Sequence, residues 1–224
     1  MLDGLLPPSL LRSSMEAATA LYEQNVMGLA SYLDARGVDE AGARSFRLGL
    51  ISEPAVPEHE RFVGMMSLPY LSKGGVLALK FRCLEQHDCK AFHHGKYDQP
   101  SGQKLHLFNV NALLSGSDTV ILCEGELSAI VSERQLGVPT VATPGTQWAK
   151  EHPHWPRCFG DVERVIVVAD HDITDDEGKG IAHAKRVHAS LPNSEMVLPP
   201  KGLDLDEWIL ADGADAVRER LGIA

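Results

Sequence analysis

The second half of the chain alternates between short apolar runs and helical segments, and this alternation limits the fold more than any other feature. TVILC, VPTVA, RVIVVAD and SEMVL are apolar runs rich in β-branched residues, which is typical of buried strands. GELSAIVSERQLG and GIAHAKRVHASL separate them and have helical composition. Strands separated by helices predict a mostly parallel sheet flanked by helices, which is an α/β fold.

Acidic side chains follow three of these predicted strands. Glu124 comes directly after TVILC, and Asp170 and Asp172 follow RVIVVA. Asp204 and Asp206 follow SEMVL and the loop PPKGL. Because the ligands of parallel sheets bind outside the carboxyl ends of the strands, we expect these carboxylates to gather at one edge.

Such a group of carboxylates suits a divalent metal. Mg²⁺ prefers oxygen ligands, and a pair of metal ions can hold both oxygens of an in-line displacement. Residues i and i+2 of an extended segment share a face, so each Asp-x-Asp pair can direct both carboxylates to one side. We therefore predict a site for Mg²⁺ or Mn²⁺ that serves phosphoryl transfer on nucleic acids. The alternative for either pair alone is a solvated loop charge or a helix N-cap, and Asp204 is placed to cap LDEWILADG.

The order of the acidic motifs resembles a known family. EGELSA, VVADHD and LPPKGLDLDEWI resemble the Toprim domain shared by bacterial-type primases, topoisomerases, OLD-type nucleases and recombination-repair proteins. The third motif, and VPTVATPGT, resemble bacterial and phage primases in particular. The resemblance covers residues 118 to 212. It implies a Toprim domain with C-terminal helices at 118–224, preceded by a smaller mixed α+β subdomain at 1–117.

The first half of the chain resembles the rest of a primase catalytic core. YLDARGVDEAGARSFRLG is similar to its beginning, and LPYLSKGGVLALKFRC with GKYDQPSGQKLHLFNV is similar to its basic subdomain. The resemblance implies that Arg82, Lys96 and Tyr97 contact nucleotide or template, with Lys104 as a weaker candidate. The alternative is that Arg82 and Lys96 are ordinary surface charges.

The function that this resemblance implies is that of a phage-like DNA primase core, a metal-dependent enzyme that makes RNA primers on single-stranded DNA. Glu124, Asp170 and Asp172 would be its catalytic residues, and ribonucleoside triphosphates and a replicative helicase its further partners. One alternative is a Toprim nuclease, although the ATPase motif GxxxxGK[ST] that often accompanies such nucleases does not occur here. The other alternative is a non-catalytic nucleic-acid-binding module.

Three features depart from the family pattern. Ser128 occupies the position where Glu-Gly-x-x-Asp has its aspartate, and Glu126 is a partial substitute. ITDDEGKG is inserted after the second motif. The sequence contains neither a separate zinc-ribbon domain nor a helicase-binding domain, so we expect template selection and helicase coupling to come from elsewhere or to be dispensed with.

The segment CLEQHDCKAFHH is rich in soft metal ligands. It contains Cys83, His87, Cys89, His93 and His94. Thiolates and imidazoles bind Zn²⁺, but the spacing does not match a C-x₂-C knuckle. The sequence favours the other interpretation, a loop of thiols and solvated imidazoles.

Composition and charge limit the class of protein. The net charge of −10 means that contact with phosphates is local or metal-mediated rather than spread over a basic surface. No apolar run reaches the roughly 18 residues that a membrane span requires. The first residues, MLDGLLPPSLLRSS, contain no basic region of a secretion signal, so the expected location is the cytoplasm.

Overall fold

The computed structural model describes residues 9–148, 152–171 and 178–223. Contacts within the chain divide it into two compact units, Met1–His106 and Leu107–Ala224, and each is described by itself. Asp172, one of the predicted metal ligands, lies outside the described residues. Among the helices of the described ranges, none combines the length and the apolar character that crossing a membrane requires.

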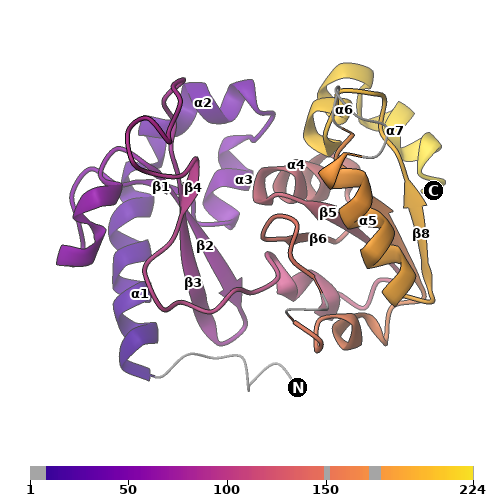
Figure 1. Ribbon diagram of the computed structural model, residues 1–224, viewed down its shortest axis with the longest axis horizontal. Helices are drawn as coiled ribbons and strands as arrows, with labels where there is room; N and C mark the ends of the chain where they lie inside the picture. Colours follow the sequence, from indigo (N-terminus) through magenta and orange to yellow (C-terminus); the bar gives the residue numbers. More distant parts are fainter. Residues whose placement is uncertain (1–8, 149–151, 172–177, 224) are drawn as a thin grey trace. The chain divides into compact units, whose positions relative to one another are not determined.

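The first unit packs helices against a small antiparallel sheet (Figure 1). Its helical segments are α1 (Ser9–Tyr22), η2 (Glu23–Leu29), α2 (Ala30–Ala35), α3 (Glu40–Ser45) and η3 (Pro57–Phe62). Its strands, in sheet order, are β1 (Gly49–Leu50), β2 (Met66–Ser72), β3 (Gly75–Arg82) and β4 (Tyr97–Asp98). Every neighbouring pair is antiparallel.

Tertiary contacts break the long helix that composition predicts for residues 9 to 36. α1 ends at Tyr22, and Asn25 has φ −101° and ψ 21°, outside the helical region. The Asn25 side chain donates a hydrogen bond to Ser52 Oγ at 3.0 Å. Gly49 lies so close to the end of α1 that a Cβ at this residue would be 2.2 Å from the carbonyl carbon of Tyr22. The strand and the helix can approach this closely only because residue 49 has no side chain.

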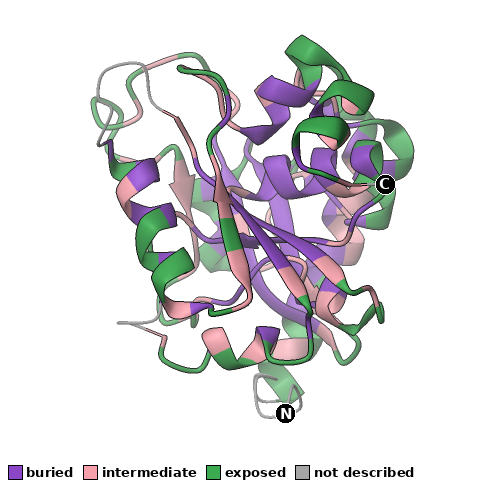
Figure 2. Ribbon diagram, turned by 90° about the vertical axis from the view of Figure 1, so that its right-hand side faces the viewer, coloured by how far each residue is buried: buried purple, intermediate pink, exposed green. Residues whose placement is uncertain are grey.

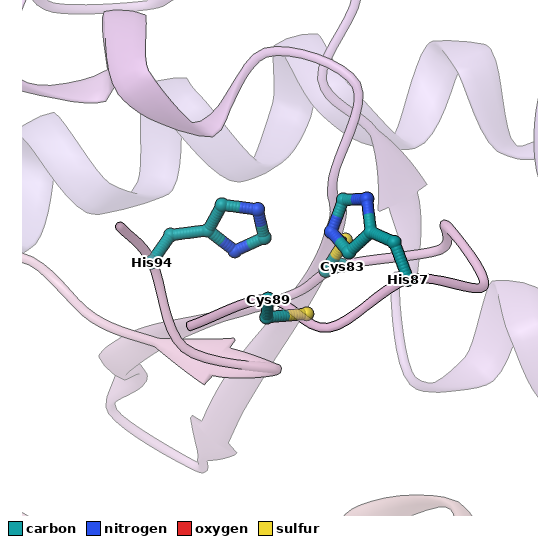
Figure 3. Close-up of side chains that lie close together, drawn as sticks. All are labelled: Cys83, His87, Cys89 and His94. Atoms are coloured by element: carbon teal, nitrogen blue, oxygen red, sulfur yellow. The ribbon is translucent and has the colours of Figure 1, made fainter. Parts of the chain in front are cut away.

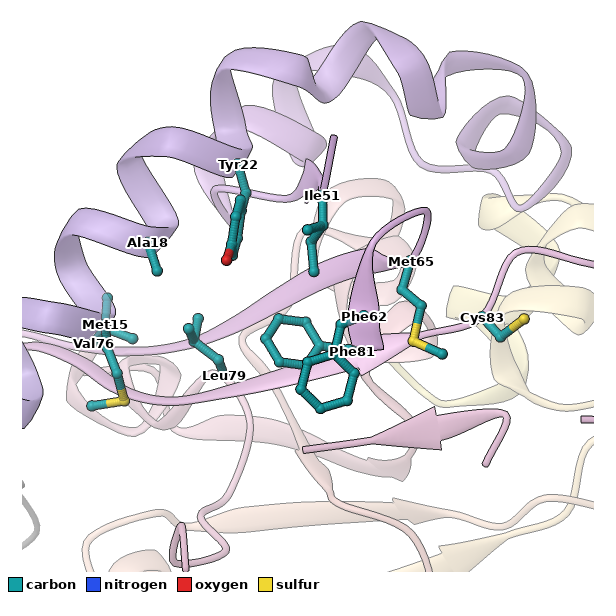
Figure 4. Close-up of a cluster of buried hydrophobic side chains, with 10 residues drawn as sticks. All are labelled: Met15, Ala18, Tyr22, Ile51, Phe62, Met65, Val76, Leu79, Phe81 and Cys83. Carbon is teal, nitrogen blue, oxygen red and sulfur yellow. The ribbon is translucent and has the colours of Figure 1, made fainter. Parts of the chain in front are cut away.

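An aromatic and aliphatic cluster holds α1 on the sheet (Figure 4). The β-like runs MMSLPYL and VLALKFRC with the turn signal SKGG between them predict two strands joined by a turn, and β2 and β3 form this hairpin, with Ser72 opposite Gly75. The rings of Phe62 and Phe81 have centroids 4.3 Å apart. The cluster consists of Met15, Ala18, Tyr22, Ile51, Phe62, Met65, Val76, Leu79, Phe81 and Cys83.

The second unit is built on a four-stranded, entirely parallel sheet in the order β6-β5-β7-β8. The strands are β5 (Thr119–Glu124), β6 (Thr140–Thr143), β7 (Arg164–Val168) and β8 (Ser194–Val197). The helices are η4 (Val110–Leu114), α4 (Glu126–Leu136), η5 (Pro156–Phe159), α5 (Lys179–Ser190), α6 (Leu205–Asp212) and α7 (Ala214–Arg220). Buried residues run along β5, β6 and β7, the edge strand β8 is more exposed, and exposed residues lie on the outer helix faces (Figure 2). The parallel sheet with flanking helices confirms the predicted α/β fold.

The alternating segment KLHLFNV at 104–110 predicts a strand or a strand-to-helix junction, and the structure has the junction. Phe108 makes one isolated bridge with Ala142 of β6, and η4 follows and packs on the same strand. These contacts are why the second compact unit begins at Leu107. Whether 117/118 is the boundary between independently folding domains stays a prediction.

Removing the Phe81 ring should destabilise the first unit strongly. Phe81 is fully buried and contacts Phe62 and His59, so Phe81→Ala loses burial and leaves a cavity. We expect a loss of about 3–5 kcal/mol in the free energy of unfolding. Urea denaturation measures it, with Val63→Ala, at a residue 46% exposed, as the control. Equal losses in the two variants would contradict this view of the core.

Candidate functional site

The parallel register brings Glu124 and Asp170 to the same edge of the sheet. Glu124 is the last residue of β5, and β7 lies beside β5 with Leu122 opposite Val167. Asp170 follows the end of β7 by two residues. Neighbouring strands are about 4.8 Å apart, so the two carboxylates are close, and both residues line one small cavity together with Cys123.

Backbone hydrogen bonds tie the Asp170 segment to the loop that leads into α6. The His171 N–H donates to the carbonyl of Leu203 at 3.2 Å. The His171 ring donates through Nδ1 to the carbonyl of Pro199 at 2.8 Å, since a carbonyl can only accept. These bonds hold Asp170 close to the beginning of α6, where Asp204 lies.

Asp204 is the N-cap of α6, as the alternative interpretation of this residue predicted. Its carboxylate accepts a hydrogen bond from the Glu207 N–H at 3.0 Å, and the Glu207 side chain accepts one from the Asp204 N–H at 3.2 Å. This capping box fixes the start of the helix. The helix then directs Asp206 inward, where it is fully buried and accepts a hydrogen bond from Ser128 Oγ at 2.5 Å.

The carboxylates are close enough to change one another's chemistry. Burial, with the hydrogen bond and charge of Asp206, raises the pKa of Asp204 to about 7. Burial also raises the pKa of the Cys123 thiol well above its usual range, and nearby carboxylates add to the effect: Asp170, Asp206, Asp204 and Glu126. The site is therefore a concentration of negative charge at the carboxyl edge of the sheet, a suitable environment for a cation.

Two residues of α5 belong to this site although no motif marked them. His183 is buried, lines the same cavity, and has Nε2 3.0 Å from Thr143 Oγ1. Burial, helped by the charge of Arg186, lowers the pKa of His183 to about 4, so its ring is neutral. A Cβ on Gly180 would lie 2.4 Å from the Asp170 carbonyl oxygen, so only glycine lets α5 come this close. The sequence signal was the helical spacing that puts residues 180 and 183 on one buried face.

In the first unit, the structure pairs Arg82 with Tyr97. The two residues are opposite each other on β3 and β4, and Arg82 donates a hydrogen bond to the Tyr97 hydroxyl. The guanidinium carbon lies 4.8 Å from the Tyr97 ring centroid and 5.5 Å from that of Tyr32. Arg82 is only 6% exposed, so the alternative of an ordinary surface charge is wrong for this residue.

The other predicted nucleic-acid contacts are more exposed. Lys96 and Lys104 are on the surface of the first unit. Tyr97 is half-buried and also has the Lys80 ammonium 4.5 Å from its ring centroid, so cations occupy ring surface that a stacked base would need. The role of these side chains in binding nucleic acid stays a prediction.

The cysteine–histidine segment is also in the first unit. Its ligand atoms come together for four residues, Cys83, His87, Cys89 and His94 (Figure 3). His93 is not among them: it is exposed and has a positive φ of 59°. The structure thus brings His94, rather than His93, together with the other three side chains, a difference that the spacing of residue types does not predict. Whether the segment binds zinc stays open at this point.

Comparisons with known proteins place the chain in a phage family. No family model matches it. It is 33% identical to the Gene 57 protein of Mycobacterium phage D29 over 163 residues, which is 70% of this chain and 98% of that protein. The chain belongs to the family of this phage protein.

Solved structures of bacterial primases have the same fold. The zinc-binding and RNA polymerase domains of the Aquifex aeolicus primase align with a TM-score of 0.73 and 16% identity, over 93% of this chain and 59% of that one. The RNA polymerase domain of Mycobacterium tuberculosis DnaG, in complex with double-stranded DNA, aligns with a TM-score of 0.75 and 21% identity. The alignment covers 96% of this chain and 81% of that one. A DnaG catalytic domain bound to single-stranded DNA aligns with a TM-score of 0.73 and 19% identity, over 95% of this chain and 80% of that one. The sequence-based resemblance to primase cores is thus confirmed for the fold.

Within this DnaG-like fold, a local contact explains why position 128 is a serine rather than an aspartate. An aspartate at 128 would face the buried carboxylate of Asp206, whereas the serine hydroxyl donates a hydrogen bond to it. Glu126, the expected partial substitute, is buried at the start of the same helix, α4. In this chain, serine at position 128 therefore makes an attractive contact with Asp206, where a second carboxylate would be repelled.

Ser128 variants test this contact. Ser128→Ala removes a donor to a buried carboxylate, and we expect a loss of about 1–3 kcal/mol in unfolding free energy. Ser128→Asp should cost more without metal, because it sets a second carboxylate against Asp206. Urea denaturation in a metal-free buffer gives the order of the three proteins. An aspartate variant at least as stable as the unmodified chain would contradict the argument.

The raised pKa of Asp204 predicts a pH-dependent stability. The group binds its proton more tightly in the folded chain, at a pKa of about 7, than in the unfolded chain, at about 4. The stability that it contributes is complete below pH about 4 and is lost as the pH rises towards 7. Asp204→Asn keeps an N-cap acceptor but removes the titration.

The measurement is the melting temperature without metal across this pH range. The Asp204→Asn variant should lose less stability than the unmodified chain as the pH rises. Asp161→Asn, at an exposed position of the same unit, should behave like the unmodified chain. If the melting temperatures of all three proteins changed with pH in the same way, the link between Asp204 protonation and stability would be ruled out.

Proposed function

We propose that this chain is the catalytic core of a phage-like DNA primase, which joins ribonucleotides into primers on a single-stranded DNA template. One observation carries the proposal: Glu124 and Asp170 line one cavity, and the Asp204–Asp206 pair begins the helix tied to it, in a fold that matches DnaG catalytic cores. The three acidic motifs thus meet where parallel sheets hold their ligands.

The donor set fits Mg²⁺ or Mn²⁺, the metals expected for such a site. All of its ligands are carboxylates, which hard divalent cations prefer. Burial, followed by the neighbouring Asp206 carboxylate, raises the pKa of Asp204, and a bound cation would offset this cost of ionisation. The residues that would hold the metal are Glu124, Asp170, Asp172, Asp204 and Asp206. When bound, the metal supplies positive charge beside the phosphates of a nucleoside triphosphate.

The side chains of this chain would do the rest. Glu124 is our candidate for proton transfer at the attacking oxygen, because it is the carboxylate at the strand end. Asp170 and Asp172 would complete the catalytic group. Neutral His183 would hold Thr143 at the wall of the cavity rather than add charge.

Nucleic acid would contact the first unit through a few positive groups. We assign Arg82, Lys96 and Tyr97 to nucleotide or template binding, with Lys104 as a weaker contact. A protein with a net charge of −10 neutralises few phosphates, so binding should weaken with salt along a shallow slope. Solved DnaG cores with single- and double-stranded DNA support a DNA partner. Ribonucleoside triphosphates, a replicative helicase and a cytoplasmic location complete the proposal.

A synthesis and cleavage assay tests the function. The purified chain is incubated with single-stranded DNA, labelled ribonucleotides and Mg²⁺ or Mn²⁺, and both new polymer and cut DNA are scored. Polymer supports the proposal. Cut DNA without polymer would replace it with the Toprim nuclease alternative. Neither product, with DNA still bound, would replace it with a non-catalytic binding module.

Removing charge from the catalytic edge should abolish activity without unfolding the chain. We expect Asp170→Asn to lower primer synthesis on the order of a hundredfold, the usual effect of losing one electrostatic contact to a transition state. The double variant Asp170→Asn, Asp172→Asn should be inactive. Asp161→Asn provides the matched control at an exposed aspartate. Near-normal synthesis by the double variant would overturn the site assignment.

A further inference from the structure

We propose that the loop joining β3 to β4 binds a structural zinc ion through two thiolates and two imidazoles, those of Cys83, His87, Cys89 and His94 (Figure 3). This site is in the first unit and is separate from the carboxylates of the second unit. It does not depend on the proposed function, since its ligands and its tests differ from those of the catalytic edge.

The spacing of the ligand atoms suits tetrahedral zinc. The two Sγ atoms and one ring nitrogen of each histidine all lie within 4.8 Å of one another. Zn–S bonds of about 2.3 Å and Zn–N bonds of about 2.0–2.1 Å put tetrahedral neighbours roughly 3.3–3.8 Å apart. Cys83 Sγ and His87 Nε2 are already 3.5 Å apart, so small side-chain rotations complete the geometry.

Neighbouring groups orient the histidine rings for binding. His94 Nδ1 lies 3.0 Å from the carbonyl oxygen of Gly95 and must donate to it, because a carbonyl only accepts. That bond leaves the lone pair on Nε2 of His94, the arrangement typical of zinc-bound histidines. The His87 ring stacks on Phe92 at a centroid distance of 4.5 Å and an angle of 19°.

A metal crosslink would anchor a loop that has little regular structure of its own. Residues 84 to 96 contain turns but no strand, and the backbone bond from the Cys83 N–H to the Lys96 carbonyl, at 2.9 Å, closes their base. Cys83 belongs to the apolar core under α1, and Cys89 packs against that core from the loop. A metal joining these two thiols to two histidines would therefore anchor the loop on the core, beside Arg82 at the end of β3.

A disulfide is the rival use of the two thiols. Both cysteines are free in the structure. A Cys83–Cys89 disulfide would leave the convergence of His87 and His94, and the orienting bond from His94 to Gly95, without a purpose. Zinc uses all four side chains, which is why we prefer it.

Cobalt replacement tests the site directly. Chain purified under reducing conditions should contain about one zinc per molecule, the stoichiometry of a four-ligand structural site. Replacement by Co²⁺ should give the visible bands of tetrahedral cobalt and a thiolate-to-cobalt charge-transfer band in the near ultraviolet. Carboxylates cannot produce the thiolate band, and its loss in Cys89→Ser distinguishes it from any band of Cys123, the thiol at the catalytic edge. Absence of this band from reduced, folded, unmodified chain would overturn the proposal, as would a Cys83–Cys89 disulfide in metal-free chain.

The adjacent histidines provide a matched pair of variants. His94→Ala should weaken zinc binding by more than about tenfold, because changes to residues that only hydrogen-bond to a metal ligand already have an effect of this size. His93→Ala should bind zinc as tightly as the unmodified chain does. Cys89→Ser and Cys158→Ser form a second pair with the same expectation. Circular dichroism checks that each variant is folded. Retention of full affinity by folded His94→Ala would refute the ligand set, and if that variant does not fold, the cobalt spectrum of the unmodified chain decides.

Discussion

The crowding of carboxylates at the carboxyl edge of the parallel sheet is the constraint on which the second unit depends. Negative charges removed from water cost free energy unless hydrogen bonds, protons or cations compensate them. The chain supplies two such hydrogen bonds: the Ser128 hydroxyl donates to Asp206, and the Glu207 N–H donates to Asp204. Burial and the nearby Asp206 carboxylate nevertheless raise the pKa of Asp204, so its ionised form remains costly. A site that remains short of positive charge is prepared to bind a cation.

In the first unit the buried charge that we singled out is positive rather than negative. Arg82 is a buried cation that donates a hydrogen bond to the Tyr97 hydroxyl and lies against the rings of Tyr32 and Tyr97. A guanidinium against aromatic faces keeps its charge while losing solvent, so its field is screened less than that of a surface lysine. The loop that carries the cysteine–histidine group starts directly after this arginine, so anchoring the loop would also fix the surroundings of Arg82.

Local patterns predicted most elements of the fold. The strands around Glu124 and Asp170 were readable because short β-branched runs have few other stable conformations in a globular protein. The predicted helix at 9–36 is interrupted at Asn25, and the segment at 104–110 forms a strand-to-helix junction with a single bridge at Phe108, because contacts with distant residues decided both. Propensity is a weak prior wherever a segment must fit against a neighbour.

The sequence by itself determined that acidic residues follow strand ends in a parallel sheet, because strand polarity and helix crossovers bring those ends to one edge. Only the tertiary structure decided which side chains meet there. It paired Ser128 with Asp206, brought His183 to the cavity wall, and chose His94 over His93 as a neighbour of the thiols. Such contacts join residues far apart in sequence or depend on one backbone angle, and neither distance nor angle is encoded in the spacing of residue types.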